Sequence, residues 1–248
     1  MVDEVLGIEV WGDYGHFRKN FTTSSPLTYG VPPRTAVSGL LGAIKGLRRR
    51  GENNYHEVFS EENSKIAIIP KPSPDTGKQR LNLNLLKLDD GETKKLLKVG
   101  EAPSEIIRSQ VPFEVIRKPR YRIYFSVDDD LMDEFEELLS SGKSVYTPCL
   151  GISEYLADYK FLGRFELEDS SGEAEVDSVL NKEKYQVEFE KGDEKTKYIV
   201  ENTPLFMNQE RVGQRFAQVV YRENGDPIRK KNGKHYTLSN GDKIAFLG

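Results

Sequence analysis

The order of hydrophobic periodicities along the chain constrains its fold more than any other feature of the sequence. Apolar residues at every second position predict strands, and apolar residues at three- and four-residue spacing predict helices. The predicted order is strand 5–11, helix 32–51, strand 64–70, strand 121–127, helix 128–142 and strand 161–167. This order, with a long segment inserted before the third strand, predicts an α+β fold of the ferredoxin-like type.

The first predicted helix has clear signals at both ends. It opens at Pro32-Pro33, and proline is tolerated in the first turn of a helix. Arg48-Arg49-Arg50 is predicted to form its last turn, where cations suit the helix dipole, and Gly51 is predicted to end it.

The inserted segment runs from about residue 71 to 112. It contains four prolines and the alternating stretch Leu81-Asn82-Leu83-Asn84-Leu85. Because alternation is typical of strands, we expect a hairpin-like arm that projects from the sheet.

Residues 169–248 show a different pattern. Short strand-like runs alternate with Asn-Gly pairs at 224–225, 232–233 and 240–241, which are typical of tight turns. We therefore expect two domains, 1–168 with the inserted arm and a small β-rich domain at 169–248. The basic run 229–234 is expected to be a solvated turn tip.

The charge is distributed unevenly along the chain. The 248 residues carry 36 Lys and Arg against 40 Asp and Glu, a net charge of −4. Residues 71–125 hold 12 basic and 7 acidic side chains, whereas residues 126–200 hold 8 and 20. The first half could therefore hold a polyanion while the acidic middle stays solvated or faces another protein. Ordinary surface charge would give the same totals.

Several classes of protein are disfavoured by the composition. Cys149 is the single cysteine, and three widely spaced histidines do not suggest a metal site. No phosphate-binding glycine motif and no Ser-centred elbow occurs, so we expect no cofactor and no metal. No apolar run is long enough to cross a bilayer and no secretory signal is visible, so we expect a cytoplasmic protein without a membrane partner.

The stretch between the first strand and the first helix is the most informative. Aromatic and cationic side chains alternate in it, including Phe17, Arg18, Phe21 and Tyr29. Such a mixture suits single-stranded nucleic acid, because rings stack on bases and cations meet phosphates. Phe21 and Tyr29 could equally pack in the interior, and Arg18 could simply be solvated.

The start of the first predicted helix offers a second candidate site. The backbone amides near Arg34 and Thr35 would be a ready site for an anion.

Four segments resemble the Cas-five family of CRISPR-associated RAMP proteins. They are Gly-x-x-x-x-Phe-Arg at Gly12 to Arg18, Thr-Tyr-Gly-Val-Pro-Pro-Arg-Thr-Ala at Thr28 to Ala36, Gly-Leu-Leu-Gly-Ala-Ile at Gly39 to Ile44, and the later Tyr-Thr-Pro-Cys-Leu-Gly-Ile-Ser-Glu-Tyr-Leu-Ala at Tyr146 to Ala157. Together they are most similar to the type I-B branch.

The resemblance implies a function in RNA-guided defence. Family members cap the 5′ handle of the guide RNA (crRNA) in a Cascade-type complex. Their ferredoxin-like, RRM-like domain holds the handle, and the inserted arm acts as a thumb over the guide. It also implies contacts with the large subunit and the backbone filament subunit. Target DNA near the protospacer-adjacent motif is a further expected partner.

The expected RNA-binding residues come from two sources. The resemblance assigns Phe17, Arg18, Tyr29, Arg34 and Thr35, and places Tyr146 to Gly151 along the handle groove. Charge and position within the arm add a further set: Arg80, Asn82, Arg108, Gln110, Arg117, Lys118 and Arg120.

Two other functions stay open at this point. The type I-C branch of the family cuts precursor RNA without metal, using Tyr, Lys and His as acid and base. Here the corresponding trio would be His16, Tyr29 and Lys118, but Pro119 stands where a Lys-His pair would be expected. We therefore expect a non-catalytic protein. The remaining alternative is a free-standing RNA-binding domain unrelated to CRISPR.

Overall fold

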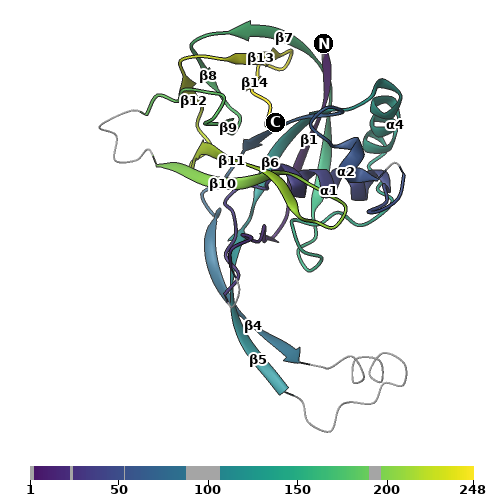
Figure 1. The fold of residues 1–248 in the computed structure, drawn as a ribbon, viewed down its shortest axis with the longest axis vertical. Helices are drawn as coiled ribbons and strands as arrows, with labels where there is room; N and C mark the ends of the chain where they lie inside the picture. The colour runs from purple at the N-terminus through teal and green to yellow at the C-terminus, as the bar shows by residue number, and fades with distance from the viewer. Residues whose placement is uncertain (1–2, 23–24, 53, 88–106, 190–196) are drawn as a thin grey trace.

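The computed structural model describes residues 3–22, 25–52, 54–87, 107–189 and 197–248. Its largest sheet has six strands in the order β14-β13-β7-β1-β6-β3 (Figure 1). Their bounds are β1 Glu4–Trp11, β3 Lys65–Pro70, β6 Arg120–Ser126, β7 Asp158–Ser171, β13 Lys234–Leu238 and β14 Lys243–Ile244.

The connections within this sheet follow the order predicted from the sequence. Helix α1 (Arg34–Lys45) lies between β1 and β3 in the chain, and α4 (Asp129–Ser140) lies between β6 and β7. β1 pairs antiparallel with both β6 and β7, and β6 pairs antiparallel with β3. β1 is buried on both sides, since Leu6 and Ile8 join the main core while Val5 joins a smaller apolar cluster on the other face.

Helix α1 ends earlier than its sequence indicates. Gly46 adopts a left-handed conformation (φ 81°) and its N–H bonds to the carbonyl of Gly42, which closes the helix. A short helix, α2 (Tyr55–Val58), follows. The run 48–50 therefore lies beyond the helix, and the predicted end at Gly51 is wrong.

The inserted segment forms the expected arm. β4 (Gly77–Lys87) and β5 (Ile107–Arg117) pair antiparallel along their whole length and extend away from the body (Figure 1). The two-residue strand β2 (Tyr14–Gly15) pairs with the base of β5. The arm thus continues to Arg117, beyond the expected limit at 112, and part of the insertion lies outside the described residues.

The C-terminal region is rich in strands, as predicted. Its further strands are β8 Ala174–Val176, β9 Leu180–Asn181, β10 Tyr198–Met207, β11 Gly213–Arg222 and β12 Ile228–Lys230. The glycines of its three Asn-Gly pairs all have positive φ. The segment 185–189, expected as a strand, makes only an isolated bridge between Val187 and Lys230.

The C-terminal strands share the core of the body. Leu205 and Val220 belong to the same apolar cluster as Leu6 and Leu41, and β13 pairs with β7 inside the largest sheet. The expected boundary between residues 168 and 169 falls within β7. The sheet and the core both continue across it.

The outer edge of β3 is covered by two C-terminal segments. The N–H of Val179 bonds to the carbonyl of Ile68 at 2.8 Å, and the N–H of Leu247 bonds to the carbonyl of Ile66 at 2.8 Å. Among the described residues, no helix is long and apolar enough to span a membrane.

Candidate nucleic-acid interface

The loop after β2 folds back on itself as a small hairpin. The N–H of Tyr29 bonds to the carbonyl of Phe17 at 2.9 Å, and Arg18 forms a bridge with Thr28. Successive side chains of an extended backbone point to opposite sides. Phe17 therefore points inward and is 4% exposed, whereas Arg18 lies on the surface.

Two aromatic residues expected to stack on RNA bases are interior instead. Phe17 packs edge-on against Tyr121, with ring centroids 6.2 Å apart. The hydroxyl of Tyr29 donates to the carbonyl of Asn202 at 3.0 Å, and burial raises the pKa of Tyr29 to about 12. The interior alternative thus holds for Tyr29, and base stacking by Phe17 or Tyr29 is wrong for this structure. Phe21, by contrast, is 69% exposed and is free to stack.

The side chains of Arg34 and Thr35 at the start of α1 point into the body. Arg34 is 1% exposed, and its guanidinium donates to the carbonyl of Phe59 at 2.6 Å and to the Oγ of Ser64 at 2.6 Å. It also stacks over the ring of Phe206. Burial lowers the pKa of Arg34 to about 9. Arg34 and the buried Thr35 therefore hold the helix against the body, and the expected contact of these side chains with RNA is wrong.

The segment 146–157 packs directly on the segment 12–18. The N–H of His16 bonds to the carbonyl of Leu150 at 2.9 Å. Gly151 has φ 95°, and a Cβ there would lie 1.9 Å from the carbonyl oxygen of His16, so only glycine fits. Tyr146 is 57% exposed, and its N–H bonds to the carbonyl of Ala43 near the end of α1. Gly151 thus has a packing role, whereas Tyr146 remains available on the surface.

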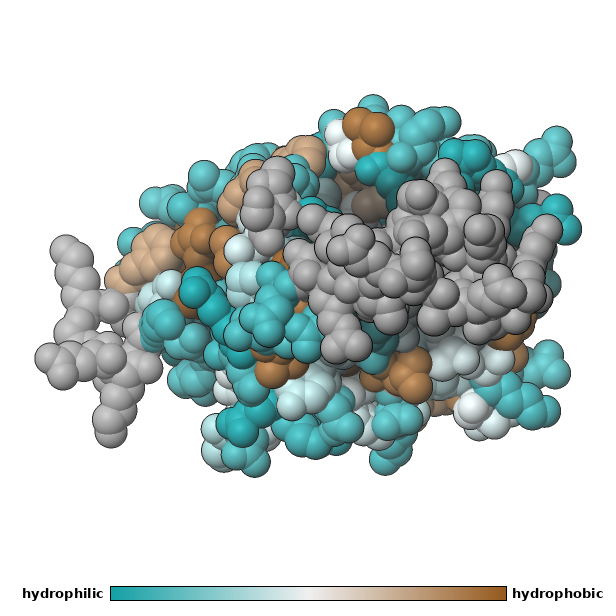
Figure 2. Space-filling model, turned by 90° about the horizontal axis from the view of Figure 1, so that it is seen from below, coloured by the Kyte–Doolittle hydropathy of each residue, from teal (hydrophilic) through white to brown (hydrophobic). Residues whose placement is uncertain are grey.

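The arm presents a polar face. Arg80, Asn82 and Gln110 are exposed, and strand alternation places them on one side of the hairpin. The opposite side carries half-buried apolar residues: Leu81, Leu83, Val111 and Phe113. Figure 2, which views the molecule from below, shows a largely hydrophilic surface with scattered apolar patches. Arg108 lies opposite Leu86 in the hairpin, and its side chain is outside the described part.

The base of the arm carries the remaining expected cations. Lys118 has φ 47° and pairs with Asp13, which raises the pKa of Lys118. Arg120 pairs with Glu9. Arg117 is exposed at the end of β5. Within the described part of the chain, Arg117, Arg80 and Arg18 have no acidic partner.

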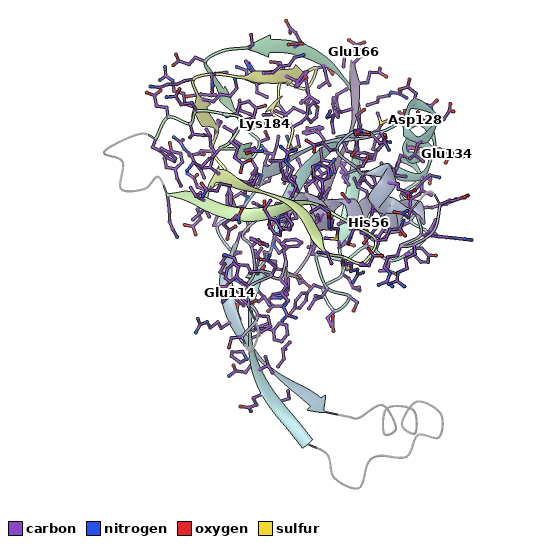
Figure 3. The ribbon with its side chains drawn as sticks, viewed as in Figure 1. His56, Glu114, Asp128, Glu134, Glu166 and Lys184 are labelled. Carbon is purple, nitrogen blue, oxygen red and sulfur yellow. The ribbon has the colours of Figure 1, made fainter. Side chains whose placement is uncertain are left out.

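These three arginines belong to chain segments that meet at one structural junction. The main chain of Arg18 is bridged to Thr28, and the N–H of Thr28 donates to Glu114 Oε2 at 2.9 Å. Glu114 lies opposite Arg80 in the hairpin and three residues before Arg117 in β5. Figure 3 places Glu114 at the base of the arm. Exposed cations beside the exposed ring of Phe21 are the chemistry that single-stranded nucleic acid requires.

The trio expected for an endoribonuclease is not assembled. The Nδ1 of His16 contacts the carbonyl of Glu114 at 2.7 Å, while its buried Nε2 has no hydrogen-bond partner among the residues that the structure describes. Burial lowers the pKa of His16. Because Tyr29 bonds to Asn202 and Lys118 pairs with Asp13, the three side chains serve separate contacts.

A buried carboxylate that the sequence interpretation missed lies beside this junction. Glu201, in β10, is 8% exposed and forms an ion pair with Lys19 at 2.8 Å. Burial alone would raise the pKa of Glu201, but hydrogen bonds from Lys19 and from the N–H of Gly30 lower it. An acidic residue at an inward position of an alternating strand was the available signal.

A groove on the body is unsuited to a polyanion. It measures about 1000 Å³ and lies between α1, α2, β3 and α4. Its charged lining is mostly acidic: Glu57, Glu62, Asp128 and Glu134 against Lys45 and Lys65. Figure 3 shows Asp128 and Glu134 on the body, away from the arm. Among the described residues, no group of three or more His, Cys, Asp and Glu could hold a metal ion.

Several known proteins similar to this chain are described as CRISPR proteins. The chain matches the family described as CRISPR-associated protein (Cas_Cas5) over residues 5–220. No curated protein matches it. A chain of a "CRISPR RNA-guided surveillance complex" aligns with a TM-score of 0.51 and 10% identity, over 91% of both chains.

Two further solved structures are similar. A chain of the Type III-B Cmr-beta complex bound to cognate target RNA and AMPPnP gives a TM-score of 0.50 and 10% identity, over 90% of this chain and 86% of that one. A CRISPR protein from Archaeoglobus fulgidus gives 0.49 and 14% identity over the full length of both chains. At 10% identity the surveillance-complex chain and the Cmr-beta chain show a shared fold. The family match covers most of the sequence. The chain therefore belongs to the Cas5 family of CRISPR-associated proteins.

Proposed function

We propose that this protein is a non-catalytic crRNA-binding subunit of a type I CRISPR effector complex. It caps the 5′ handle of the guide, with the β7-β1-β6-β3 unit serving as the ferredoxin-like RAMP domain and the β4–β5 arm as a thumb. Contacts with the large subunit and the backbone filament subunit, and membership of the type I-B branch, belong to the same proposal.

The observation that carries the proposal is the junction at the base of the arm. Arg18, Arg80 and Arg117 lie there without acidic partners in the described part of the chain, and the exposed ring of Phe21 belongs to the same loop as Arg18. Arginine guanidinium groups bind phosphate oxygens, and an exposed ring stacks on a splayed base. One similar structure is a CRISPR RNA-guided surveillance complex, and another is a complex bound to cognate target RNA, which supports RNA as the ligand.

The test is incubation of the purified protein with RNA of its own CRISPR repeat in EDTA, read on a denaturing gel and by a mobility shift. We expect intact RNA and binding that depends on the handle. Site-specific cleavage would contradict the non-catalytic assignment. Binding without preference for the handle would contradict the capping role.

A further inference from the structure

The carboxylate of Glu201 receives contacts from three separate segments of the chain. Lys19 of the hairpin loop lies 2.8 Å from it, and the N–H of Gly30 donates to it at 2.9 Å. The hydroxyl of Tyr221 in β11 donates at 3.0 Å, and Lys78 of the arm lies 3.7 Å away. One buried group of the C-terminal region thus meets both the loop and the arm.

The arm and the loop are joined to each other at the same place. Lys78 donates to the carbonyl of Thr28 at 3.0 Å, and Glu114 accepts from the N–H of Thr28 at 2.9 Å. Both strands of the arm are therefore bonded to a single residue of the loop. Glu201 completes the junction from the side of β10.

The two lysines that contact Glu201 are neighbours of Arg18 and Arg80. Lys19 follows Arg18 directly in the loop, and Lys78 shares the polar face of β4 with Arg80. A carboxylate that fixes both lysines also fixes the distance between Arg18 and Arg80. β10 does not depend on Glu201 for its own place, since it pairs with β11 over nearly its whole length.

We propose that Glu201 is a positioning residue for RNA binding, which holds the loop 16–31 against the base of the arm so that cations of both engage one RNA strand. This inference rests on the proposed function. Glu201 itself does not contact RNA, because its carboxylate is enclosed by these partners.

One substitution distinguishes a positioning role from a simple charge effect, because the two predict opposite changes in RNA affinity. Glu201→Gln keeps the size of the side chain and removes one negative charge, so electrostatics alone would tighten RNA binding. Loss of positioning would weaken it instead, and we expect about tenfold weaker binding of repeat RNA. Glu223→Gln is the matched control, because Glu223 forms an exposed pair with Lys197 near the end of β11. We expect this control to bind as the wild type does, or slightly tighter.

Hydrogen exchange of the RNA-free protein tests the same inference without RNA. In Glu201→Gln the amides of Lys19, Tyr29 and Gly30 should exchange at least about tenfold faster, while those of β1 and β6 stay unchanged. If the wild type fails to bind RNA, the proposed function fails, but this exchange pattern still decides whether Glu201 positions the loop.

A second variant covers the case in which Glu201→Gln does not fold. Lys19→Met removes the partner from the loop side. Because it also removes a positive charge that would favour RNA binding, it is tested by hydrogen exchange, in which the amides of Tyr29 and Gly30 should exchange faster, as in Glu201→Gln. Where both single variants fold, the double variant should bind no more than about twofold weaker than Glu201→Gln, since both changes break one contact. Unchanged or tighter RNA binding by Glu201→Gln, or unchanged exchange of these amides in Lys19→Met, would overturn the inference.

Discussion

Three arginines at the base of the arm (Arg18, Arg80 and Arg117) look like the cations of the C-terminal turn in the sequence, but the two groups have different partners. In the C-terminal turn Arg229 pairs with Glu173, Lys231 with Glu188, and Lys234 with Asp169. At the arm, Arg18, Arg80 and Arg117 have no acidic partner among the described residues. A basic run therefore marks a binding surface only where folding leaves its charges unpaired.

Lys230 makes the contrast sharper. The run 229–234 was expected to be a solvated turn tip, but Lys230 is fully buried and donates to the carbonyls of Gly172 and Gly233. Burial lowers the pKa of Lys230. The expectation was wrong for Lys230, because β12 pairs with β8 and carries this side chain inward, whereas Arg229, Lys231 and Lys234 are exposed as expected.

The largest effect should come from a cation that is buried. We expect Arg34→Met to lower the free energy of unfolding by about 3 kcal/mol, because Phe59 and Ser64 lose their donor. Urea denaturation measures this change. The fraction that remains folded should bind RNA within about twofold of the wild type. If Arg34→Met had normal stability but had lost RNA binding, Arg34 would be a binding residue and not a structural one.

The free cations should affect binding rather than stability. Replacing Arg18, Arg80 and Arg117 together by Gln should weaken the binding of repeat RNA by roughly 30-fold and flatten its salt dependence by about two units of slope. Filter binding across a salt series measures both. The control removes the same charge from paired cations, as Arg229, Lys231 and Lys234 to Gln, and should change affinity by less than about threefold. Equal losses in the two triple variants would show that net charge alone decides binding.

Two phenylalanines of one loop extend the comparison to aromatic residues. Phe21→Ala should weaken RNA binding by about tenfold with little change in stability, because a stacking ring is lost. Phe17→Ala should instead destabilise the fold, because Phe17 packs on Tyr121. Mobility shifts and thermal melts on both variants distinguish the roles. If Phe17→Ala weakened RNA binding and Phe21→Ala destabilised the fold, Phe17 would be the RNA-binding residue that the sequence analysis expected.

The smallest expected effect is a loss of folding stability at low pH. Because burial lowers the pKa of His16, the unfolded chain binds a proton near pH 6.5 that the folded chain does not. Folding stability is therefore full above pH 6.5 and declines below it. Between pH 7 and 5.5, His16→Gln should lose less free energy of unfolding than the wild type in urea titrations at each pH. Parallel losses would mean that His16 is protonated in the folded protein.

Local periodicity was sufficient to predict strands β1, β3, β6 and β7 and the hairpin of the arm, but not that β13 and β14 join the main sheet. β1, β3 and β6 each show apolar alternation or an apolar run, and the five alternating residues of the arm lie within β4. The end of α1 was mispredicted because Arg48-Arg49-Arg50 suits a last helical turn, whereas Gly46 had already closed the helix with a left-handed residue.

The site was predicted less well because its geometry depends on distant contacts. Whether Phe17 or Phe21 faces solvent is decided by the pairing of the loop with Tyr29, which no local pattern reveals. Arg34 looks like an anion ligand at a helix start, but its partners lie 25 to 30 residues further along the chain. Glu201 is separated from Lys19 by most of the sequence, so its role emerges only in three dimensions.

The coverage of β3 has a consequence for solubility. An open strand edge invites pairing with another copy of the chain, and β3 is strongly apolar along its length. Here the carbonyls of Ile66 and Ile68 are already taken by Leu247 and Val179. Removal of the last few residues would uncover the Ile66 end of this edge, while Val179 would still cover Ile68. Such a protein would be expected to self-associate before any defect in recognition could be measured.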